Sequence, residues 1–401
     1  MSLTIALSTV TTWRSLPAAV WLLVGARAVN RLGAFTLPFL SVTLMAEQGA
    51  SVAQAGYLLA AFGLATIPSR LLGGWLADRW GARTTIVVGL LGTAVGQLLV
   101  AGSRSVTQAA VAVVLLGLAF EVYEPPSQSL VADATTPEQR PVAFGLLFAA
   151  LAAAGMVAGL LAALLAGVDL RWLFVADAVS CLLCAGIVWW RLPGHAGPTS
   201  VAERVAGPWR DRRLLLLLAL GTGLAVVYLQ ITITLPLTVA ARGLPVSLVG
   251  LLLTVSAATV VAAQPLLAHP RWRGLDDPVA IAVGFVVVAA GLALTGLATS
   301  AAAYVATTVL WSVGDVLVMG RAYALVSAIA PATARARYLA AYGTSWGLAA
   351  VVAPLLGTQL LARAGPAATW VWLGAACLVL AAAYVLLRGP LGRPVPGGAG
   401  R

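Results

Sequence analysis

Long apolar runs alternate with short polar stretches along the whole chain. A helix needs about 20 apolar residues to cross a hydrocarbon core about 30 Å thick. Twelve runs suit this length, near residues 17-45, 53-76, 84-102, 107-132, 142-166, 171-191, 213-241, 247-268, 278-298, 302-330, 339-363 and 368-388. The pattern predicts an all-α membrane protein with twelve transmembrane helices. An even number of spans places both termini on the same side of the membrane.

The longest polar connection divides these spans into two sets of six. It covers residues 192-212, is rich in proline and glycine, and has the composition of a linker. We therefore expect an N-terminal six-helix bundle over residues 1-191 and a C-terminal one over 213-388, followed by a tail over 389-401.

The two sets of spans repeat one another. Gly49 and Gly56 match Gly243 and Gly250 at an offset of 194, and Gly89 matches Gly284 at 195. Because each copy has six helices, both have the same orientation in the membrane. Transporters built from such repeats bind substrate and coupling ions near the midplane, between the repeats.

Composition and charge agree with a membrane location. Hydrophobic residues make up 61% of the chain and charged residues 9%, compared with about 25% charged residues in soluble domains. The net charge is +11, and all 24 basic residues are arginines. They are scattered between apolar runs and form no basic face, which argues against nucleic-acid binding.

The arginines are unequally divided between the two sides of the predicted membrane. One side has 16 of the 24 (Arg14, Arg79, Arg83, Arg140, Arg191, Arg204, Arg210, Arg212, Arg213, Arg271, Arg273, Arg335, Arg337, Arg388, Arg393 and Arg401), and the other has four (Arg104, Arg171, Arg242 and Arg363). This bias predicts that the first side, with both termini, is cytoplasmic. The lysine-free, alanine-rich composition suggests a bacterial protein, and hence the bacterial cytoplasmic (inner) membrane.

The sequence gives no sign of a metal, a cofactor or an enzyme active site. The three cysteines (Cys181, Cys184 and Cys377) lie in apolar runs and both histidines in loops. Walker A, H-E-x-x-H and G-x-S-x-G motifs are absent. An integral-membrane enzyme is therefore a remote alternative. Trp21, Trp172, Trp189 and Trp370 fall near span ends, where tryptophan commonly anchors helices at the interface.

Two polar stretches resemble signatures of the Major Facilitator Superfamily. The first cytoplasmic loop, Gly73-Gly-Trp-Leu-Ala-Asp-Arg-Trp-Gly-Ala-Arg83, resembles that family's G-x-L-A-D-R-x-G-R-R loop, except that Ala82 replaces a basic residue. The stretch from Pro125 to Arg140 resembles its P-x-x-x-x-L-x-x-D-x-x-x-P-E-x-R motif after helix four. The resemblance implies two parallel six-helix pseudo-repeats around a central cavity lined by helices one, four, seven and ten.

The resemblance also implies a gate on the cytoplasmic side. Asp78 would lie against the N-terminus of a helix in the opposite half, where the helix dipole favours an anion. The other expected gating residues are Gly74, Arg79, Gly81, Arg83, Asp133 and Arg140. The equivalent loop of the second half, residues 265-274, lacks the pattern, which suggests that the gate is one-sided.

Acidic residues inside spans are the strongest functional signal. A charge at the centre of a membrane helix costs about 2.5 to 3.5 kcal/mol on insertion scales and is by default a functional hypothesis. Glu121 lies mid-way along helix four, and the offset of 194 places Asp315 at the equivalent point of helix ten, so the two should face each other across the cavity. Glu124 shares the face of Glu121, and Pro125 and Pro126 should kink the helix beside it.

Arginines supply the opposite charge. Arg27 and Arg31 flank Asn30 on helix one, and Arg321 lies on helix ten at a depth expected to be comparable. Neighbouring carboxylates raise the proton affinity of a buried carboxyl and an arginine lowers it. We predict that Glu121, Glu124 or Asp315 takes up a coupling proton, while the arginines of helix one compete for it. For each single charge, simple helix-to-helix pairing is the alternative.

The candidate substrate cavity collects polar and aromatic residues of the central helices: Arg27, Asn30, Arg31, Tyr123, Tyr228, Gln230, Trp311, Tyr342 and Trp346. The resemblance implies a monomeric secondary transporter, with proton-coupled export of a drug or metabolite as the first hypothesis. Proton-coupled uptake of a small organic anion or zwitterion is the alternative, because Arg27 and Arg31 could bind an anion. The exporter motif of helix five is only partly present, at Gly155 and Gly159, and leaves the direction open.

Overall fold

The chain is helical throughout the part that the structure describes. The computed structural model describes residues 15–33, 36–166, 169–192, 207–244, 247–269, 272 and 274–392. The helices are α2 (Ala18–Leu32), α3 (Thr36–Gln48), α4 (Val52–Trp80), α5 (Ala82–Gly102), α6 (Val106–Phe120), α7 (Glu124–Asp133), α8 (Arg140–Ala166), α9 (Arg171–Arg191), α10 (Arg212–Ala241), α11 (Ser247–Ala263), α12 (Pro265–Ala268), α14 (Asp277–Leu297), α15 (Ala301–Ile329), α16 (Arg335–Leu386) and α17 (Arg388–Gly392), with 3₁₀ turns at Pro208–Arg210 and Ala332–Ala334. Residues 193–206 of the predicted linker and 393–401 of the tail lie outside these ranges.

The predicted all-α membrane fold is confirmed. Among the described residues, eleven helical stretches are long and apolar enough to cross a membrane. The predicted first span, 17-45, covers α2 and most of α3, and residues 34 and 35 between them lie outside the described ranges. The last two spans lie within α16, which is interrupted at Gly365, where φ is 74° and favours a residue without a side chain.

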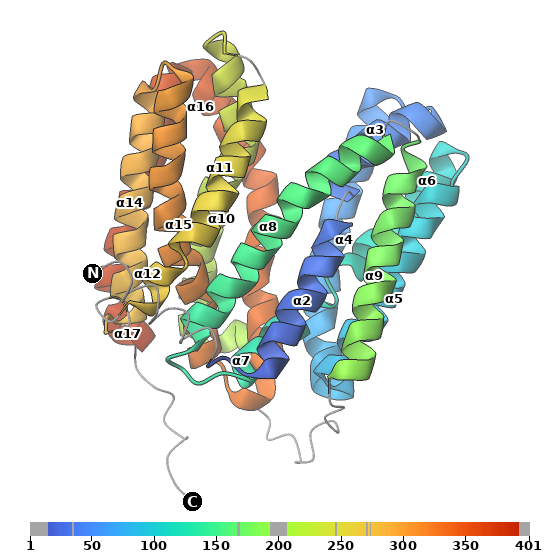
Figure 1. Ribbon diagram of the computed structural model, residues 1–401, viewed down its shortest axis with the longest axis horizontal. Helices are drawn as coiled ribbons and strands as arrows, with labels where there is room; N and C mark the ends of the chain where they lie inside the picture. Colours follow the sequence, from blue (N-terminus) through green and yellow to red (C-terminus); the bar gives the residue numbers. More distant parts are fainter. Residues whose placement is uncertain are drawn as a thin grey trace, which may run out of the picture.

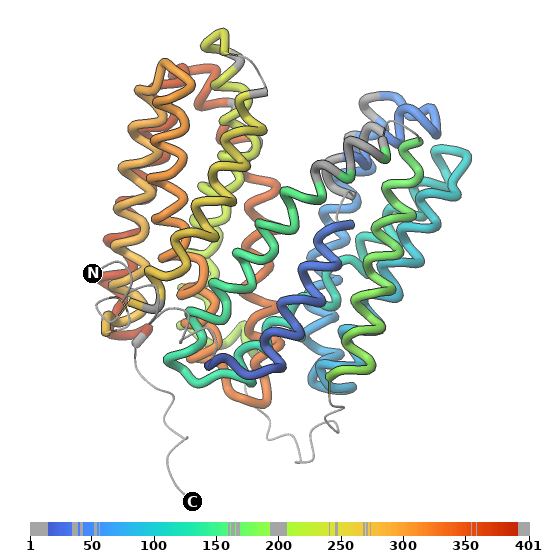
Figure 2. The backbone as a smooth tube through the Cα atoms, in the orientation of Figure 1, coloured from blue at the N-terminus to red at the C-terminus, as the bar shows by residue number. Residues whose placement is uncertain are grey.

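The helices form two bundles. Helices α2 to α9, which we call the first half, lie together, and helices α10 to α17, the second half, form the other bundle (Figure 1). The bundles approach each other at the bottom of the view and diverge towards the top, as the backbone trace also shows (Figure 2). Between the halves, α4 packs against α16, and α8 packs against α11 and α15.

Small residues allow the halves to meet near the end predicted to be cytoplasmic. A Cβ atom added to Gly74 of α4 would lie 2.8 Å from the Cβ of Ala340 on α16, and one added to Gly320 of α15 would lie 2.6 Å from the carbonyl oxygen of Pro141 on α8. Both distances are too short for a side chain. The helix backbones are therefore in direct contact at this end.

Large apolar side chains cover the outside of the bundles, as expected for a surface that faces lipid. Exposed examples on four helices are Val111, Leu183, Leu294 and Val379. Trp21, Trp172 and Trp189 are also exposed, in agreement with interfacial anchoring. Trp370 is different: it is buried, and its indole N–H donates to Thr238 Oγ at 2.9 Å, so its position near a span end did not indicate an interfacial role.

Candidate functional site

A break in helix four places two carboxylates inside the first half. Helix α6 ends at Phe120, α7 begins at Glu124, and residues 121–123 form a turn. Pro125 and Pro126 have no N–H to donate to the carbonyls of residues 121 and 122. The Glu121 carbonyl accepts instead from the N–H of Glu124, at 3.2 Å. The predicted kink is thus present, and both glutamates belong to it.

Glu124 is held by an arginine of helix one. The Arg27 guanidinium forms an ion pair with Glu124, and both side chains are largely buried. The same guanidinium lies 4.5 Å from the centre of the Tyr123 ring, and Gln128 Nε2 donates to Glu124 Oε1 at 3.0 Å. Asn30, one turn along α2, donates to Cys181 Sγ at 3.2 Å. These contacts join α2, α7 and α9 inside the first half.

Glu121 is paired with Arg70, an arginine within an apolar run that was not among the candidate residues. Arg70 of α4 donates from Nη1 to Glu121 Oε2 at 2.8 Å, and the Glu121 N–H donates to Ser69 Oγ at 3.0 Å. Arg70 should have been weighed with Arg27, because an arginine within a span needs a partner wherever it lies. Helix two therefore contributes an intramembrane charge as well as the candidate gating residues at its end.

Asp315 lies in different surroundings, inside the second half. It is half-buried and belongs to a small hollow with Tyr228 and Trp311, whose other walls are apolar: Leu224, Val227, Ile231, Phe285, Val288 and Val318. Within the described ranges, Asp315 takes part in none of the ion pairs. No hydrogen bond or ion pair in that part of the chain joins Asp315 to Glu121, and their opposition across the cavity stays a prediction.

The remaining cavity candidates separate into two groups. Tyr228 packs edge to face on Trp346, with ring centres 5.3 Å apart, and is influenced electrostatically by both Asp315 and Arg31. Arg31 itself is exposed. Gln230 and Tyr342 are fully buried, and Gln230 Nε2 donates to the Ala353 carbonyl at 2.9 Å. Neither Gln230 nor Tyr342 lines the hollow.

Arg321 does not join the central charges. Its guanidinium donates to Asp277 Oδ1 at 2.7 Å and to the Leu275 carbonyl at 3.2 Å, and also contacts the Trp272 carbonyl. These groups lie at the beginning of α14, near the predicted cytoplasmic end. Arg321 therefore pairs with a carboxylate and backbone carbonyls at the beginning of α14, and in the described residues it forms no ion pair with the central glutamates.

The candidate gate involves two arginines of α16. Asp78 pairs with Arg337 and Asp133 pairs with Arg335, both in the first turn of α16 in the second half. Gly81, with φ at 81°, ends α4 just beyond Asp78, and Gly74 provides the close approach to α16. The N-terminus of α16 thus receives a carboxylate from each of the two signature stretches.

The other arginines assigned to the gate bind within the first half. Arg83 donates to the Trp189 carbonyl, and its guanidinium lies over the Trp189 ring, 4.5 Å from the ring centre. Arg140 Nε donates to the Ala132 carbonyl at 3.2 Å, and Arg79 lies 5.5 Å from the Trp75 ring centre. Among the described ion pairs, Asp133 therefore binds Arg335 and neither Arg83 nor Arg140. Arg335 and Arg337, which entered the sequence analysis only as part of the charge bias, supply the positive charges.

Known proteins resemble this chain over most of its length. The model of the Major Facilitator Superfamily matches residues 23–354. An MFS-type transporter of Bacillus subtilis, YqjV, is 26% identical over 361 residues, which cover 86% of this chain and 87% of that protein. The multidrug resistance protein MdtH of Cronobacter sakazakii is 26% identical over 315 residues, covering 77% and 78%.

Solved structures show the same fold at low sequence identity. The human organic anion transporter MFSD10 has a TM-score of 0.75 at 17% identity and covers 92% of this chain and 100% of its own. The proton:xylose symporter XylE has a TM-score of 0.72 at 14% identity, covering 94% and 96%. With the helical fold, the signature stretches and the family match in agreement, the chain belongs to the Major Facilitator Superfamily and is a multi-pass membrane transporter.

Proposed function

We propose that this transporter exports a small organic compound, a drug or a metabolite, in exchange for protons. The observation that carries the proposal is the uneven pairing of the intramembrane carboxylates. Glu121 and Glu124 each form an ion pair with an arginine. Asp315 instead lines an apolar hollow and takes part in no ion pair of the described residues. A transporter that only needed rigid helix packing would have no use for a half-buried, unpaired carboxylate there.

The ion pairs provide a way to exchange a proton. A carboxylate beside an arginine stays ionised, and moving the arginine away favours protonation. If the pairs of Glu121 and Glu124 change between the two orientations of the transporter, a proton binds on one side and leaves on the other. One charge moving through 100 mV supplies about 2.3 kcal/mol, which sustains a substrate gradient of about fiftyfold.

The hollow around Asp315 suits one end of an organic molecule. Aliphatic side chains and the Trp311 and Tyr228 rings would bury apolar surface, while Asp315 supplies one strong polar contact. Export is favoured over uptake because relatives with 26% identity are multidrug resistance proteins. An integral-membrane enzyme is disfavoured, because the family and the structural neighbours are transporters.

Uptake of an organic anion or zwitterion is the second candidate. Arg31 is exposed and takes part in no ion pair of the described residues. It interacts electrostatically with Tyr228, as Asp315 does. It could therefore bind an acidic group of a substrate. We further propose that the protein acts as a monomer in the bacterial cytoplasmic membrane, with both termini in the cytoplasm.

Transport in proteoliposomes under an imposed pH gradient tests the proposal. Antiport predicts that an acidic vesicle interior drives uptake of a fluorescent amphipathic dye, and symport predicts uptake with an acidic exterior. Glu121→Gln and Asp315→Asn should each abolish the dependence on the gradient while leaving gradient-free exchange. Dye movement that ignores the gradient in the wild type, or full coupling in the double variant, would refute the proposal.

A fourth intramembrane carboxylate offers a matched control. Asp177 is buried in α9, where it accepts from Gln97 Nε2 at 2.6 Å. Asp177→Asn removes a buried charge outside the proposed proton sites and should keep gradient-driven flux. Equal loss of coupling in all three variants would indicate a general loss of structure instead of a specific role.

A further inference from the structure

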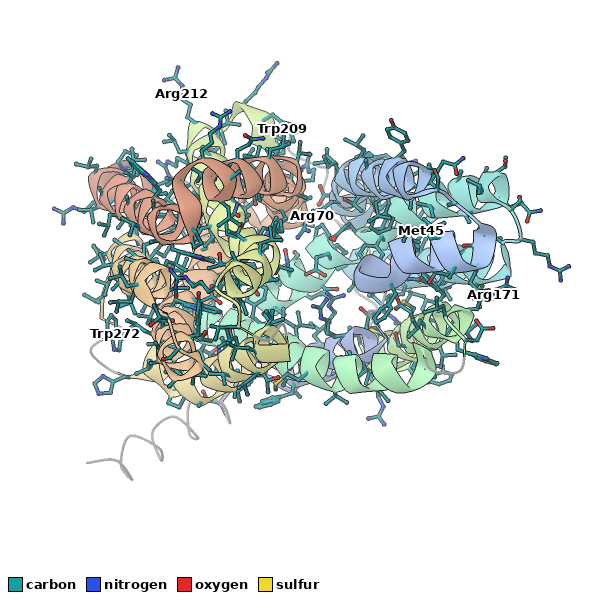
Figure 3. The ribbon with its side chains drawn as sticks, turned by 90° about the horizontal axis from the view of Figure 1, so that it is seen from above. Met45, Arg70, Arg171, Trp209, Arg212 and Trp272 are labelled. Atoms are coloured by element: carbon teal, nitrogen blue, oxygen red, sulfur yellow. The ribbon has the colours of Figure 1, made fainter. Side chains whose placement is uncertain are left out.

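The guanidinium of Arg70 lies at the contact between the two halves. Arg70 is buried, and one side of its guanidinium binds Glu121 Oε2 at 2.8 Å. The other side faces Gly343 of α16: a Cβ atom added to Gly343 would overlap Nε and the guanidinium carbon of Arg70. Viewed from above, Arg70 lies between the two bundles (Figure 3). The absence of a side chain at residue 343 is what makes room for this arginine.

This contact distinguishes the Arg70–Glu121 pair from its neighbour. The Arg27–Glu124 pair joins α2 to α7, both within the first half. The Arg70–Glu121 pair also belongs to the first half by sequence, but its arginine packs on the backbone surface of the second. The charged or titratable groups around it are Glu124 from α7, Arg27 from α2 and Tyr323 from α15.

We propose that Arg70 is a positioning residue that transmits the charge state of Glu121 to α16. Ionised Glu121 holds the guanidinium in the space beside Gly343, and α4 and α16 fit together. When Glu121 becomes neutral, Arg70 is left as a buried charge without its carboxylate, which strongly disfavours the packed arrangement. The guanidinium then leaves its position and the α4–α16 contact loosens.

The direction of this coupling fits proton-driven antiport. The α4–α16 contact lies near the predicted cytoplasmic end, where Gly74 meets Ala340. A proton that reaches Glu121 from outside would therefore favour opening towards the cytoplasm, where it is released. This inference rests on the proposed function, because it takes Glu121 as a group that is protonated during transport.

A double-mutant cycle between residues 121 and 343 tests the inference. Spin labels on the exposed positions Trp190, near the end of α9, and Leu386, at the end of α16, report the separation of the two halves at the cytoplasmic end. The full-length protein is measured in lipid nanodiscs, with the three native cysteines replaced by serine. Glu121→Gln imitates the protonated state and should raise the cytoplasm-open fraction.

Gly343→Ala should also raise that fraction, because its Cβ collides with a guanidinium that Glu121 holds in place. In the Glu121→Gln background the guanidinium is free to move, so the added effect of Gly343→Ala should be smaller by about threefold or more. Gly347→Ala is the matched control, because its Cβ would lie 2.8 Å from Ile67 Cγ1 on the same two helices and meets no charge. Its effect should be unchanged by Glu121→Gln.

Independent effects of residues 121 and 343, or equal coupling for Gly347→Ala, would overturn the inference. If Gly343→Ala does not yield a monodisperse protein, Arg70→Lys/Gly343→Ala replaces it, because lysine keeps the charge without the wide guanidinium. If Arg70→Lys/Gly343→Ala is monodisperse, the inference is supported. If Gly343→Ala stays aggregated when combined with either Arg70→Lys or Glu121→Gln, the inference is refuted. These measurements use no substrate. They can therefore succeed when the pH-gradient assay fails, and fail when it succeeds.

Discussion

Two ion pairs within the membrane join residues that are far apart in the sequence. Arg27 and Glu124 are 97 residues apart, and Arg70 and Glu121 are 51 apart. The sequence predicted that such charges need partners, because an unpaired charge in a membrane helix is costly. It could not predict which partner each one takes. The sequence could not distinguish Arg27 from Arg31, which are one turn apart on nearly the same face of helix one. In the folded chain Arg27 pairs with Glu124, and Arg31 is exposed.

Removing one member of the Arg27–Glu124 pair should destabilise the protein more than neutralising both. Arg27→Ala leaves Glu124 buried without its guanidinium and also removes the contact with the Tyr123 ring. Breaking a buried pair in this way costs about 3–5 kcal/mol, whereas replacing both charges is often nearly neutral. Thermal unfolding of purified protein should therefore show a much lower midpoint for Arg27→Ala than for Arg27→Met/Glu124→Gln. Equal midpoints would mean that the charges contribute little to stability.

At the scale of helices, the apolar runs located the spans but not the continuity of the backbone within them. The break in helix four could be predicted, because two prolines remove identifiable hydrogen-bond donors. The end of α2 at Leu32 could not be predicted, because a hydropathy pattern measures the length of an apolar run and does not detect tertiary contacts. Gly33, which ends α2, packs directly on Asp177 and Ser180 of α9, and this contact is invisible in the sequence.

The candidate gate joins α4 to the first turn of α16, and its contribution to closure should be modest. Neither member of the Asp78–Arg337 pair is fully buried, and such pairs contribute about 0.2–1 kcal/mol, or up to about fivefold in a population. Asp78→Asn should therefore raise the cytoplasm-open fraction by no more than about fivefold. The charge-reversed pair Asp78→Arg/Arg337→Asp should restore part of the closure. The spin-label distance between positions 190 and 386 measures both effects.

The outer end of the first half contains a matched control pair. Glu47 of α3 binds Arg171 of α9 at 3.0 Å and is similarly half-exposed. Glu47→Gln should leave the cytoplasmic spin-label distances unchanged. If Glu47→Gln shifts the spin-label distance as much as Asp78→Asn does, loss of any surface charge opens the transporter. The Asp78–Arg337 pair would then have no specific gating role.

At the scale of the whole molecule, the internal repeat and the central division predicted two bundles of parallel orientation. They could not predict which end is closed, because the same sequence must fit every state of the transport cycle. The structure brings the halves together where Asp78, Asp133 and Gly74 meet α16. The cytoplasmic assignment of that end depends on the arginine distribution and on the family resemblance of the loop that contains Asp78. The proposed direction of proton movement through Glu121 depends on the same assignment.

Labelling from the two sides of the membrane tests this orientation directly. Arg104, just after α5, and Glu138, just before α8, are both exposed and lie at opposite ends of the span formed by α6 and α7. The excess of 16 arginines over four predicts that a cysteine at Arg104 reacts with a membrane-impermeant maleimide on intact cells. A cysteine at Glu138 should react only after the cells are permeabilised. The native cysteines are buried and should give little background. The reverse labelling pattern would place the closed end outside, and proton entry to Glu121 would then have to come from the cytoplasm.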